Sequence, residues 1–242
     1  RLISGNQTIH QTVEQEAANF FQEEAALFFP SGYAANSGLL ASVPQRNDLI
    51  LLDAKAHASL KEGARLSMAR KVTFAHNNRK DLKAKILHWQ GKVEELYVVT
   101  ESLFSMDGDF APLQCLHALC QNQGAHLILD EAHSTGWYGP AGRGQVAHQG
   151  LQGKLLARVH TLGKAPGCAG AFVAGSQALI DYLVNFALPF IYTTAPPAAQ
   201  LLAAQTHLRC FAAADEPREK LQQAIDHYGQ KAQILKDSPP KQ

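Results

Sequence analysis

The segment Leu127-Ile-Leu-Asp130-Glu-Ala-His133-Ser-Thr-Gly136 is a short apolar run that ends in a carboxylate. An uninterrupted apolar run of this length, followed by turn-forming residues, is typical of a strand buried on both faces of a sheet. A carboxylate placed directly after such a strand is costly to bury unless a partner satisfies it. Asp130 is therefore either the partner of a positively charged ligand atom or the cap of the turn that follows.

On both sides of this segment, short apolar runs alternate with helical patterns. Residues 8–29 carry apolar side chains at helical spacing as far as Pro30. Strands are expected over residues 49–52, 72–75, 95–100, 126–129, 158–162 and 171–174, and helices over residues 34–43, 81–89, 113–123 and much of 177–235. The alternation predicts an α/β fold of three αβα layers, with a mostly parallel sheet and helices on both of its faces.

The composition is ordinary for an α/β protein and argues against several functions. Of the 242 residues, 46% are hydrophobic and 18% are charged, and the formal net charge is +1. Without a basic run or a strong net charge, we expect no nucleic acid and no membrane as partner. No apolar run approaches the ~20 residues that span a bilayer. The four cysteines show no metal-ligand spacing, which predicts no metal site and fits a reducing, cytoplasmic location.

Polar side chains follow four of the expected strands at the point where each strand ends. The pairs are Asp53 and His57, Glu101 and Ser105, Asp130 and His133, and Thr161 and Lys164. In an open α/β sheet, ligands bind outside the carboxyl ends of the strands. Because four such pairs are unlikely to be coincidental, we expect them to converge on one ligand site.

The segment Thr161-Leu-Gly-Lys164-Ala-Pro-Gly167-Cys-Ala-Gly170 places a lysine in a glycine-bordered turn after a strand. It is not a phosphate loop of the G-x-x-x-x-G-K-[ST] type, because Arg158 stands in place of the first glycine and Ala165 in place of the hydroxyl. A partly desolvated lysine amine has a lowered pKa and attacks aldehydes, which suits a Schiff-base role. A solvated loop lysine is the alternative.

A second glycine turn, Ser31-Gly32-Tyr33-Ala-Ala-Asn36, opens a helix. Backbone N–H groups at a helix start can hold a phosphate, and Tyr33 can flank a ligand bound there. Capped turns of this kind also occur without any ligand, so the motif does not decide the matter alone. His57 is equally ambiguous alone, since it is also compatible with an ordinary core or surface histidine.

Together these segments resemble the α-oxoamine synthases, which are fold-type I pyridoxal-phosphate enzymes that join an amino acid to an acyl thioester with loss of carbon dioxide. The resemblance extends over almost the whole chain, in the family's order. Its motifs are Phe29-Pro-Ser-Gly-Tyr-Ala-Ala-Asn36, His57-Ala-Ser-Leu60, Thr100-Glu-Ser-Leu-Phe-Ser-Met-Asp-Gly-Asp109, Asp130-Glu-Ala-His-Ser-Thr-Gly136, Thr161-Leu-Gly-Lys-Ala165 and Phe190-Ile-Tyr-Thr-Thr194.

The resemblance implies pyridoxal 5'-phosphate as the cofactor and a role for each matching residue. Lys164 resembles the Schiff-base lysine, and Asp130 the partner that keeps the pyridine nitrogen protonated. His133, with Ser105, is expected to bond the ring oxygen, and His57 to stack on the ring and meet the substrate. Lys164, His57 and His133 are thus the expected catalytic residues.

The remaining cofactor contacts are implied in the same way. Gly32, Tyr33 and Thr161 are expected to hold the phosphate, and Glu101 is expected to lie in the cofactor site. The resemblance also implies that residues 1–235 form the pyridoxal-phosphate-binding large domain, without its N-terminal segment. Residues 236–242 are expected to be a linker toward a C-terminal small domain, which would supply the arginine for the substrate carboxylate.

Two segments favour one member of the family, and two positions depart from its pattern. Ala75-His-Asn-Asn78 and the run from Leu183 to Thr194 favour the biotin-biosynthesis member, which condenses L-alanine with a pimeloyl thioester of coenzyme A or acyl carrier protein. Sibling enzymes such as glycine acetyltransferase and serine palmitoyltransferase remain alternatives, as does a non-catalytic fragment that binds the cofactor. Pro166 replaces a Leu or Phe, and Gly170-Ala171 replaces a double glycine.

Thr193 and Thr194 resemble the pair that reaches a phosphate in the neighbouring subunit, which implies a homodimer with shared active sites. The alternative is that these threonines satisfy only local backbone groups. A ligand that binds only the assembled state stabilises that state by mass action. Pyridoxal phosphate should therefore shift the cofactor-free, full-length protein from monomer toward dimer in sedimentation, and Thr193→Val with Thr194→Val should weaken the shift. A cofactor-loaded protein that stays monomeric would contradict shared sites.

Overall fold

A computed structural model describes residues 1–2 and 4–237, with side chains described as far as Lys231. The strands are β1 (Ala25–Phe29), β2 (Leu49–Asp53), β3 (Arg70–Phe74), β4 (Leu96–Glu101), β5 (His126–Asp130), β6 (Ala157–Thr161) and β7 (Ala171–Gly175). They form one sheet in the order β1-β7-β6-β5-β4-β2-β3, in which β7 is antiparallel to β1 and β6 and the other neighbouring pairs are parallel. The expectation of a mostly parallel sheet is confirmed.

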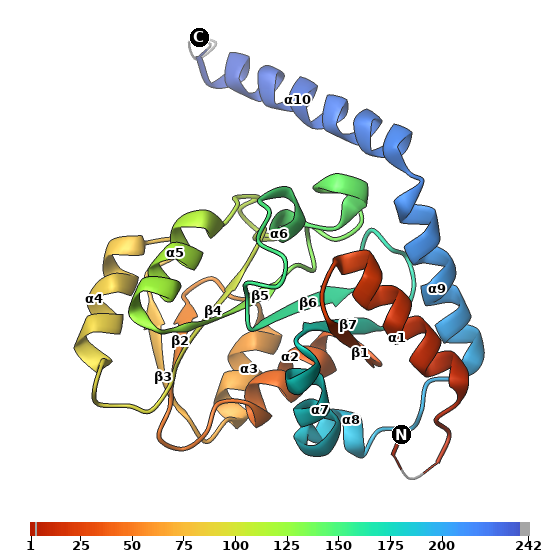
Figure 1. Ribbon diagram of the computed structural model, residues 1–242. Coiled ribbons are helices and arrows are strands. Elements are labelled where there is room, and N and C mark those ends of the chain that lie inside the picture. The colour runs from red at the N-terminus through yellow and green to blue at the C-terminus, as the bar shows by residue number, and fades with distance from the viewer. Residues whose placement is uncertain (3, 238–242) are drawn as a thin grey trace.

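Helices cover both faces of this sheet, which confirms the three αβα layers (Figure 1). The helices on one face are α2 (Gly32–Ser42), α3 (Ala58–Leu66), α7 (Gln177–Phe186) and α8 (Leu188–Ile191). Those on the other face are α1 (Thr8–Phe21), α4 (Arg79–Trp89), α5 (Leu113–Gln123), α6 (Gln145–His148) and α9 (Ala198–Ala212). Alternate strand residues supply the two cores: Val99 of β4 faces the first group and Val98 the second.

The helical pattern expected over residues 8–29 is wrong beyond Phe21, because residues 25–29 form strand β1. Helix α1 ends where Gln22 adopts a left-handed conformation (φ 58°), from which its N–H caps the carbonyls of Ala18 and Asn19. Residues 25–29 are apolar at every position, so spacing alone cannot separate a helix from a buried strand. Antiparallel pairing with β7 satisfies its backbone groups and decides the matter.

The C-terminal helix α10 (Asp215–Asp237) projects away from the layered body (Figure 1). The expected linker over residues 236–242 therefore begins within this helix, and residues 238–242 lie outside the described residues. Apolar side chains of α10, including those of Leu221, Ile225 and Tyr228, are exposed. None of the helices described is both long enough and apolar enough to cross a membrane.

A buried ion cluster ties β6 to its surroundings on the face that carries α1. Arg158 of β6 is 1% exposed and bonds the carboxylate of Glu131 at 2.9 and 2.6 Å and that of Glu23 at 2.9 Å. Its remaining N–H groups donate to the carbonyls of Phe21 and Arg143. All five donors of the guanidinium are thus satisfied, which is the condition under which a buried charge is tolerated.

Replacing Arg158 should therefore be strongly destabilising. Arg158→Met leaves Glu131 and Glu23 buried without their cation, and we expect the free energy of unfolding to fall by about 3–5 kcal/mol. Urea denaturation of the full-length protein measures this change. Arg65→Met is the matched control, because Arg65 pairs with Glu62 at the surface and should contribute less than about 1 kcal/mol. Equal losses in the two variants would show that the buried cluster is not a stabilising centre.

Candidate active site

The carboxyl ends of neighbouring strands bring two expected carboxylates together. Glu101 ends β4 and Asp130 ends β5, and the two residues are direct partners in the parallel register. Both are buried, at 4% and 5% exposure. Two carboxylates side by side in the interior require donors or a bound cation, so this edge of the sheet is the natural place for a charged ligand.

Asp130 accepts hydrogen bonds on both of its oxygens. Oδ1 accepts from the Ala132 N–H at 2.8 Å, and Oδ2 accepts from Asn36 Nδ2 at 2.7 Å. The turn-cap role left open by the sequence is therefore present. It does not exclude the ligand role, because each carboxylate oxygen can accept more than one bond.

Asn36 is a site residue that sequence reasoning missed. Its Nδ2 also donates to Ser59 Oγ at 2.9 Å, and Ser59 Oγ lies 2.7 Å from His57 Nδ1. A chain of hydrogen bonds thus runs from Asp130 through α2 and the start of α3 to His57. The available signal was a polar residue on the buried side of each helix, since Asn36 and Ser59 are 2% and 1% exposed.

His57 is exposed and caps α3, and its ring is held by hydrogen bonds with Ser59 of that helix. The Ser59 N–H donates to His57 Nδ1 at 3.2 Å, so Nδ1 acts as an acceptor and the ring proton is assigned to Nε2, which makes no described bond. The His57 N–H in turn donates to Glu101 Oε1 at 2.6 Å. The ring is therefore oriented by fixed neighbours while its other nitrogen is free.

Lys164 and His133 are in direct contact. The Lys164 amine donates to His133 Nε2 at 2.7 Å. Burial and the neighbouring Lys164 charge lower the pKa of His133, which favours the neutral ring that can accept this bond. Desolvation around the amine lowers the pKa of Lys164 as well, although the charges of Asp130 and Glu101 oppose that shift. A lysine with a lowered pKa is closer to its neutral, nucleophilic form at neutral pH.

The start of α2 lies against the end of β6. A Cβ added to Gly32 would come within 3.0 Å of Thr161 Oγ1, so a side chain at this position would crowd the threonine. Ser31 caps the helix by accepting from the Ala34 N–H, and Tyr33 at the same turn is 53% exposed. A helix N-terminus beside a hydroxyl is an arrangement that suits a phosphate group.

The turn over residues 162–170, which contains Lys164, is shaped by hydrogen bonds of its own backbone and by Gly170. The Leu162 N–H donates to the Gly170 carbonyl, and the Cys168 N–H to the Leu162 carbonyl, each at 2.9 Å. Gly170 has a φ of +119°, and a Cβ there would lie 2.3 Å from the Phe28 ring. The next residue, Ala171, replaces the family's second glycine without difficulty, because its methyl group packs inside the core.

Ser105, Thr193 and Thr194 are not brought into this cluster. Ser105 lies exposed in the turn after β4 and has no described hydrogen bond to the other site residues. Thr193 and Thr194 lie between α8 and α9, where the Thr193 carbonyl accepts from the Arg1 amino group. Their expected roles therefore remain predictions.

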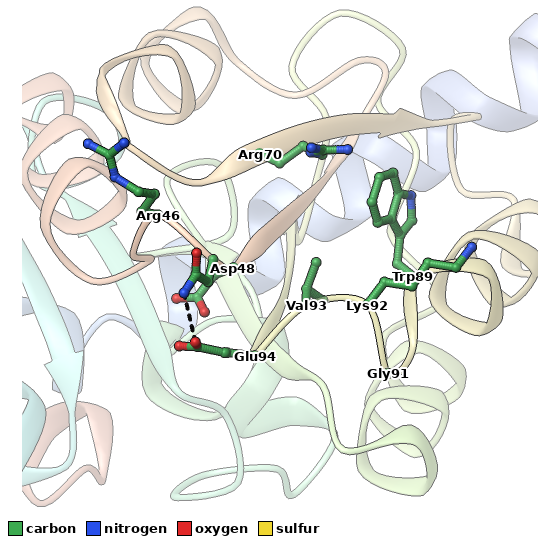
Figure 2. Close-up of a pocket in the computed structure, with 9 residues that line it drawn as sticks. Arg46, Asp48, Arg70, Trp89, Gly91, Lys92, Val93 and Glu94 are labelled. Atoms are coloured by element: carbon green, nitrogen blue, oxygen red, sulfur yellow. Dashed lines mark hydrogen bonds between the residues drawn. The ribbon is translucent and has the colours of Figure 1, made fainter.

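A hollow of about 510 Å³ lies away from this cluster, at the amino ends of β2 and β3 (Figure 2). Arg70, Trp89 and Lys92 lie on one side of it, and the Arg70 guanidinium stacks on the indole at 4.8 Å. Asp48 on the other side is already bonded by the Gln45 and Glu95 N–H groups. The residues expected to carry the chemistry are at the opposite ends of the strands, so this hollow is separate from them.

The fold is that of the large domain of a fold-type I protein, and in this chain a buried aspartate ends β5 and a lysine turn follows β6. The chain belongs to the aminotransferase class I and II family, whose sequence pattern matches residues 1–237. It is 44% identical over 236 residues to 8-amino-7-oxononanoate synthase from Serratia proteamaculans. The aligned region covers 96% of this chain and 60% of that protein. The chain thus spans about 60% of the length of the curated relatives that it matches.

Two solved structures share the fold closely. A lysine-to-alanine variant of serine palmitoyltransferase from S. paucimobilis, solved with a bound aldimine of pyridoxal phosphate and myriocin, matches with a TM-score of 0.86 and 33% identity over 92% of this chain and 57% of its own. The 8-amino-7-oxononanoate synthase from Francisella tularensis matches with a TM-score of 0.86 and 31% identity over 98% of this chain and 69% of its own.

The buried position of Glu101 gives a prediction about pH. The pKa of Glu101 is raised from 4.5 to about 7, mainly by burial and to a smaller extent by repulsion from Asp130. Between pH 4.5 and about 7, Glu101 keeps its proton in the folded protein, whereas the unfolded chain releases it. The free energy of unfolding of the cofactor-free protein therefore falls by about 3 kcal/mol as the pH rises through this range. Glu101→Gln should remove this decline in urea titrations, and Glu94→Gln at an exposed site should not. Parallel pH curves for Glu101→Gln and the parent protein would contradict it.

Proposed function

We propose that the protein binds pyridoxal 5'-phosphate at this cluster, with covalent attachment at the Lys164 amine. The observation that carries the proposal is the contact between Lys164 and His133 beside the buried carboxylate of Asp130. It places a nucleophilic amine, a neutral ring and an anion at adjoining strand ends. A solved serine palmitoyltransferase that holds pyridoxal phosphate as an internal aldimine has the same fold, which supports this assignment.

The residues present fit such a cofactor. Asp130 Oδ2, oriented by Asn36, would face a protonated pyridine nitrogen, and His133 would bond the ring oxygen. Gly32, Tyr33 and Thr161 would hold the phosphate at the start of α2. The bound cofactor supplies an electron-withdrawing ring that makes a bond at the α-carbon of an amino acid labile.

The chain's own groups would then manage protons and orientation. Lys164, with its lowered pKa, is suited to take the α-proton as a general base. His57, whose Nε2 makes no described bond, would stack on the cofactor ring and meet the substrate. The Ser59–Asn36 chain keeps His57 in register with Asp130, so the substrate and the cofactor would be oriented by one hydrogen-bonded unit.

We further propose a decarboxylating condensation of L-alanine with a pimeloyl thioester, giving the amino ketone of biotin biosynthesis, in a homodimer whose sites are completed by Thr193 and Thr194. The 44% identity to a curated 8-amino-7-oxononanoate synthase favours this substrate pair. A serine palmitoyltransferase-like reaction is the second candidate, because the fold matches that enzyme equally closely. Absorbance titration with alanine, glycine and serine, followed by mass analysis of the product, separates the two.

Loss of the attachment residue tests the cofactor assignment. Full-length protein incubated with pyridoxal phosphate and reduced with borohydride should carry the label on the peptide that contains Lys164. Lys164→Ala should lose both this label and the visible absorbance band, because Lys164 is the amine that His133 contacts. Lys154→Ala, which removes an exposed lysine, should keep both. A label that persists in Lys164→Ala would refute the assignment, and a labelled protein without turnover would indicate a binding fragment.

A further inference from the structure

A hydrogen-bonded cluster beside the site centres on His76, to which no role has been assigned above. Its Nδ1 lies 2.9 Å from Asp53 Oδ1, and its Nε2 lies 2.8 Å from Asp109 Oδ2. Asp53 ends β2 with a fully buried side chain, His76 follows β3 with 17% of its side chain exposed, and Asp109 lies in the turn after β4. One imidazole ring thus joins segments that follow three different strands.

The bonds around the ring require His76 to carry a proton on both nitrogens. Asp53 also accepts from the Lys55 N–H at 2.9 Å and the Asn77 N–H at 3.0 Å, and Asp109 Oδ2 accepts from Asn77 Nδ2 at 2.8 Å. Both carboxylates act only as acceptors, so each ring nitrogen must donate. Burial lowers the pKa of His76, but bonds to and charges of the two carboxylates outweigh it and leave the pKa above its ordinary value.

The other groups that face the ring complete an ionic cluster. The Phe104 ring packs edge-on against the imidazole at 4.4 Å. A carboxylate oxygen of Asp107 lies within 4.8 Å of a ring nitrogen of His76 and of a carboxylate oxygen of Asp109. Asp107 also forms an ion pair with Lys55 at 2.9 Å. A doubly protonated imidazole has no lone pair for a metal ion, and Lys55 already neutralises Asp107. The cluster therefore suits a clamp between charged side chains better than a metal site.

The clamp connects two loops that carry expected site residues. The loop over residues 54–57 follows Asp53 and ends at His57, and the turn over residues 104–109 contains Ser105. The turn closes on itself through the bond from the Phe104 N–H to the Asp109 carbonyl, at 3.0 Å. A turn closed in this way moves as a unit, so anchoring one residue of it positions all of it.

We propose that His76 is a positioning residue: by bonding Asp53 and Asp109 at once, it holds the turn 104–109, which contains Ser105, against the loop 54–57, which ends at His57. The clamp needs the charged imidazole. Its bonds are complete below the ordinary histidine pKa of 6.5 and are lost as pH rises through the raised value in the folded protein. The turn should therefore loosen on the alkaline side. Only the effect on cofactor binding rests on the proposed function.

Hydrogen–deuterium exchange of the full-length, cofactor-free protein tests the clamp. Asp109→Asn removes one carboxylate and keeps the side-chain size, which lowers the pKa of His76. Relative to the parent, exchange over residues 104–109 at neutral pH should increase about tenfold, the effect expected when a charge-assisted bond is lost. The pH at which the turn loosens should also move down. His76→Gln, which does not titrate in this range, should abolish that pH dependence.

Asp107→Asn is the matched control, because it makes the same substitution in the same turn and removes the other link to the loop 54–57, a half-exposed ion pair with Lys55 that should contribute little. Its exchange should stay within about twofold of the parent. Unchanged exchange in Asp109→Asn overturns the clamp, and so does an increase spread over the whole sheet.

A second measurement separates the clamp from the proposed function. The affinity for pyridoxal phosphate should fall severalfold in Asp109→Asn and stay unchanged in Asp107→Asn. Faster exchange with unchanged affinity would show that the clamp does not position the site, and would overturn the proposal. The exchange result needs neither substrate nor cofactor, so it stands even if the protein makes a different product.

Discussion

The guanidinium of Arg158 is a buried cation held by two carboxylates and two backbone carbonyls. Glu131, its main partner, follows Asp130 directly, and the other Glu131 oxygen accepts from the N–H groups of Gln145 and Val146. These bonds fix the end of β5 and the segment that follows it relative to β6. Since an isolated charge cannot stay in the interior, each of these segments must be in place for the others to fold.

The same rule governs the site itself, where charge is held by hydrogen bonds instead of a full counter-ion. Asp130 is oriented by Asn36 and by its own turn, and Glu101 by the His57 N–H. These donors are neutral, so the two adjacent carboxylates leave a negative region at the strand ends. The amine of Lys164 lies in the field of that region, which opposes the lowering of its pKa by desolvation.

Two layers of interaction can be distinguished around the strand ends. The inner one, from Asp130 to His57, is fixed by buried hydrogen bonds between helices and strands. The outer one, centred on His76, joins partly exposed loops through charged groups. An imidazole held between two carboxylates can gain or lose a proton in the neutral range. The two layers therefore hold the strand ends by different chemistry.

Local sequence patterns were enough to predict the layered sheet and the strand-end polar pairs, because buried strands and amphipathic helices have local periodicities and ligand sites follow strand termini. The strand at residues 25–29 could be assigned only in three dimensions, since an all-apolar segment has no period and needs a pairing partner. The contacts of Asn36, Arg158 and His76 also emerged only in three dimensions. Their partners are distant in sequence, at Asp130, Glu131 and Asp109, and hydrogen bonding depends on contact in space, which no local pattern encodes.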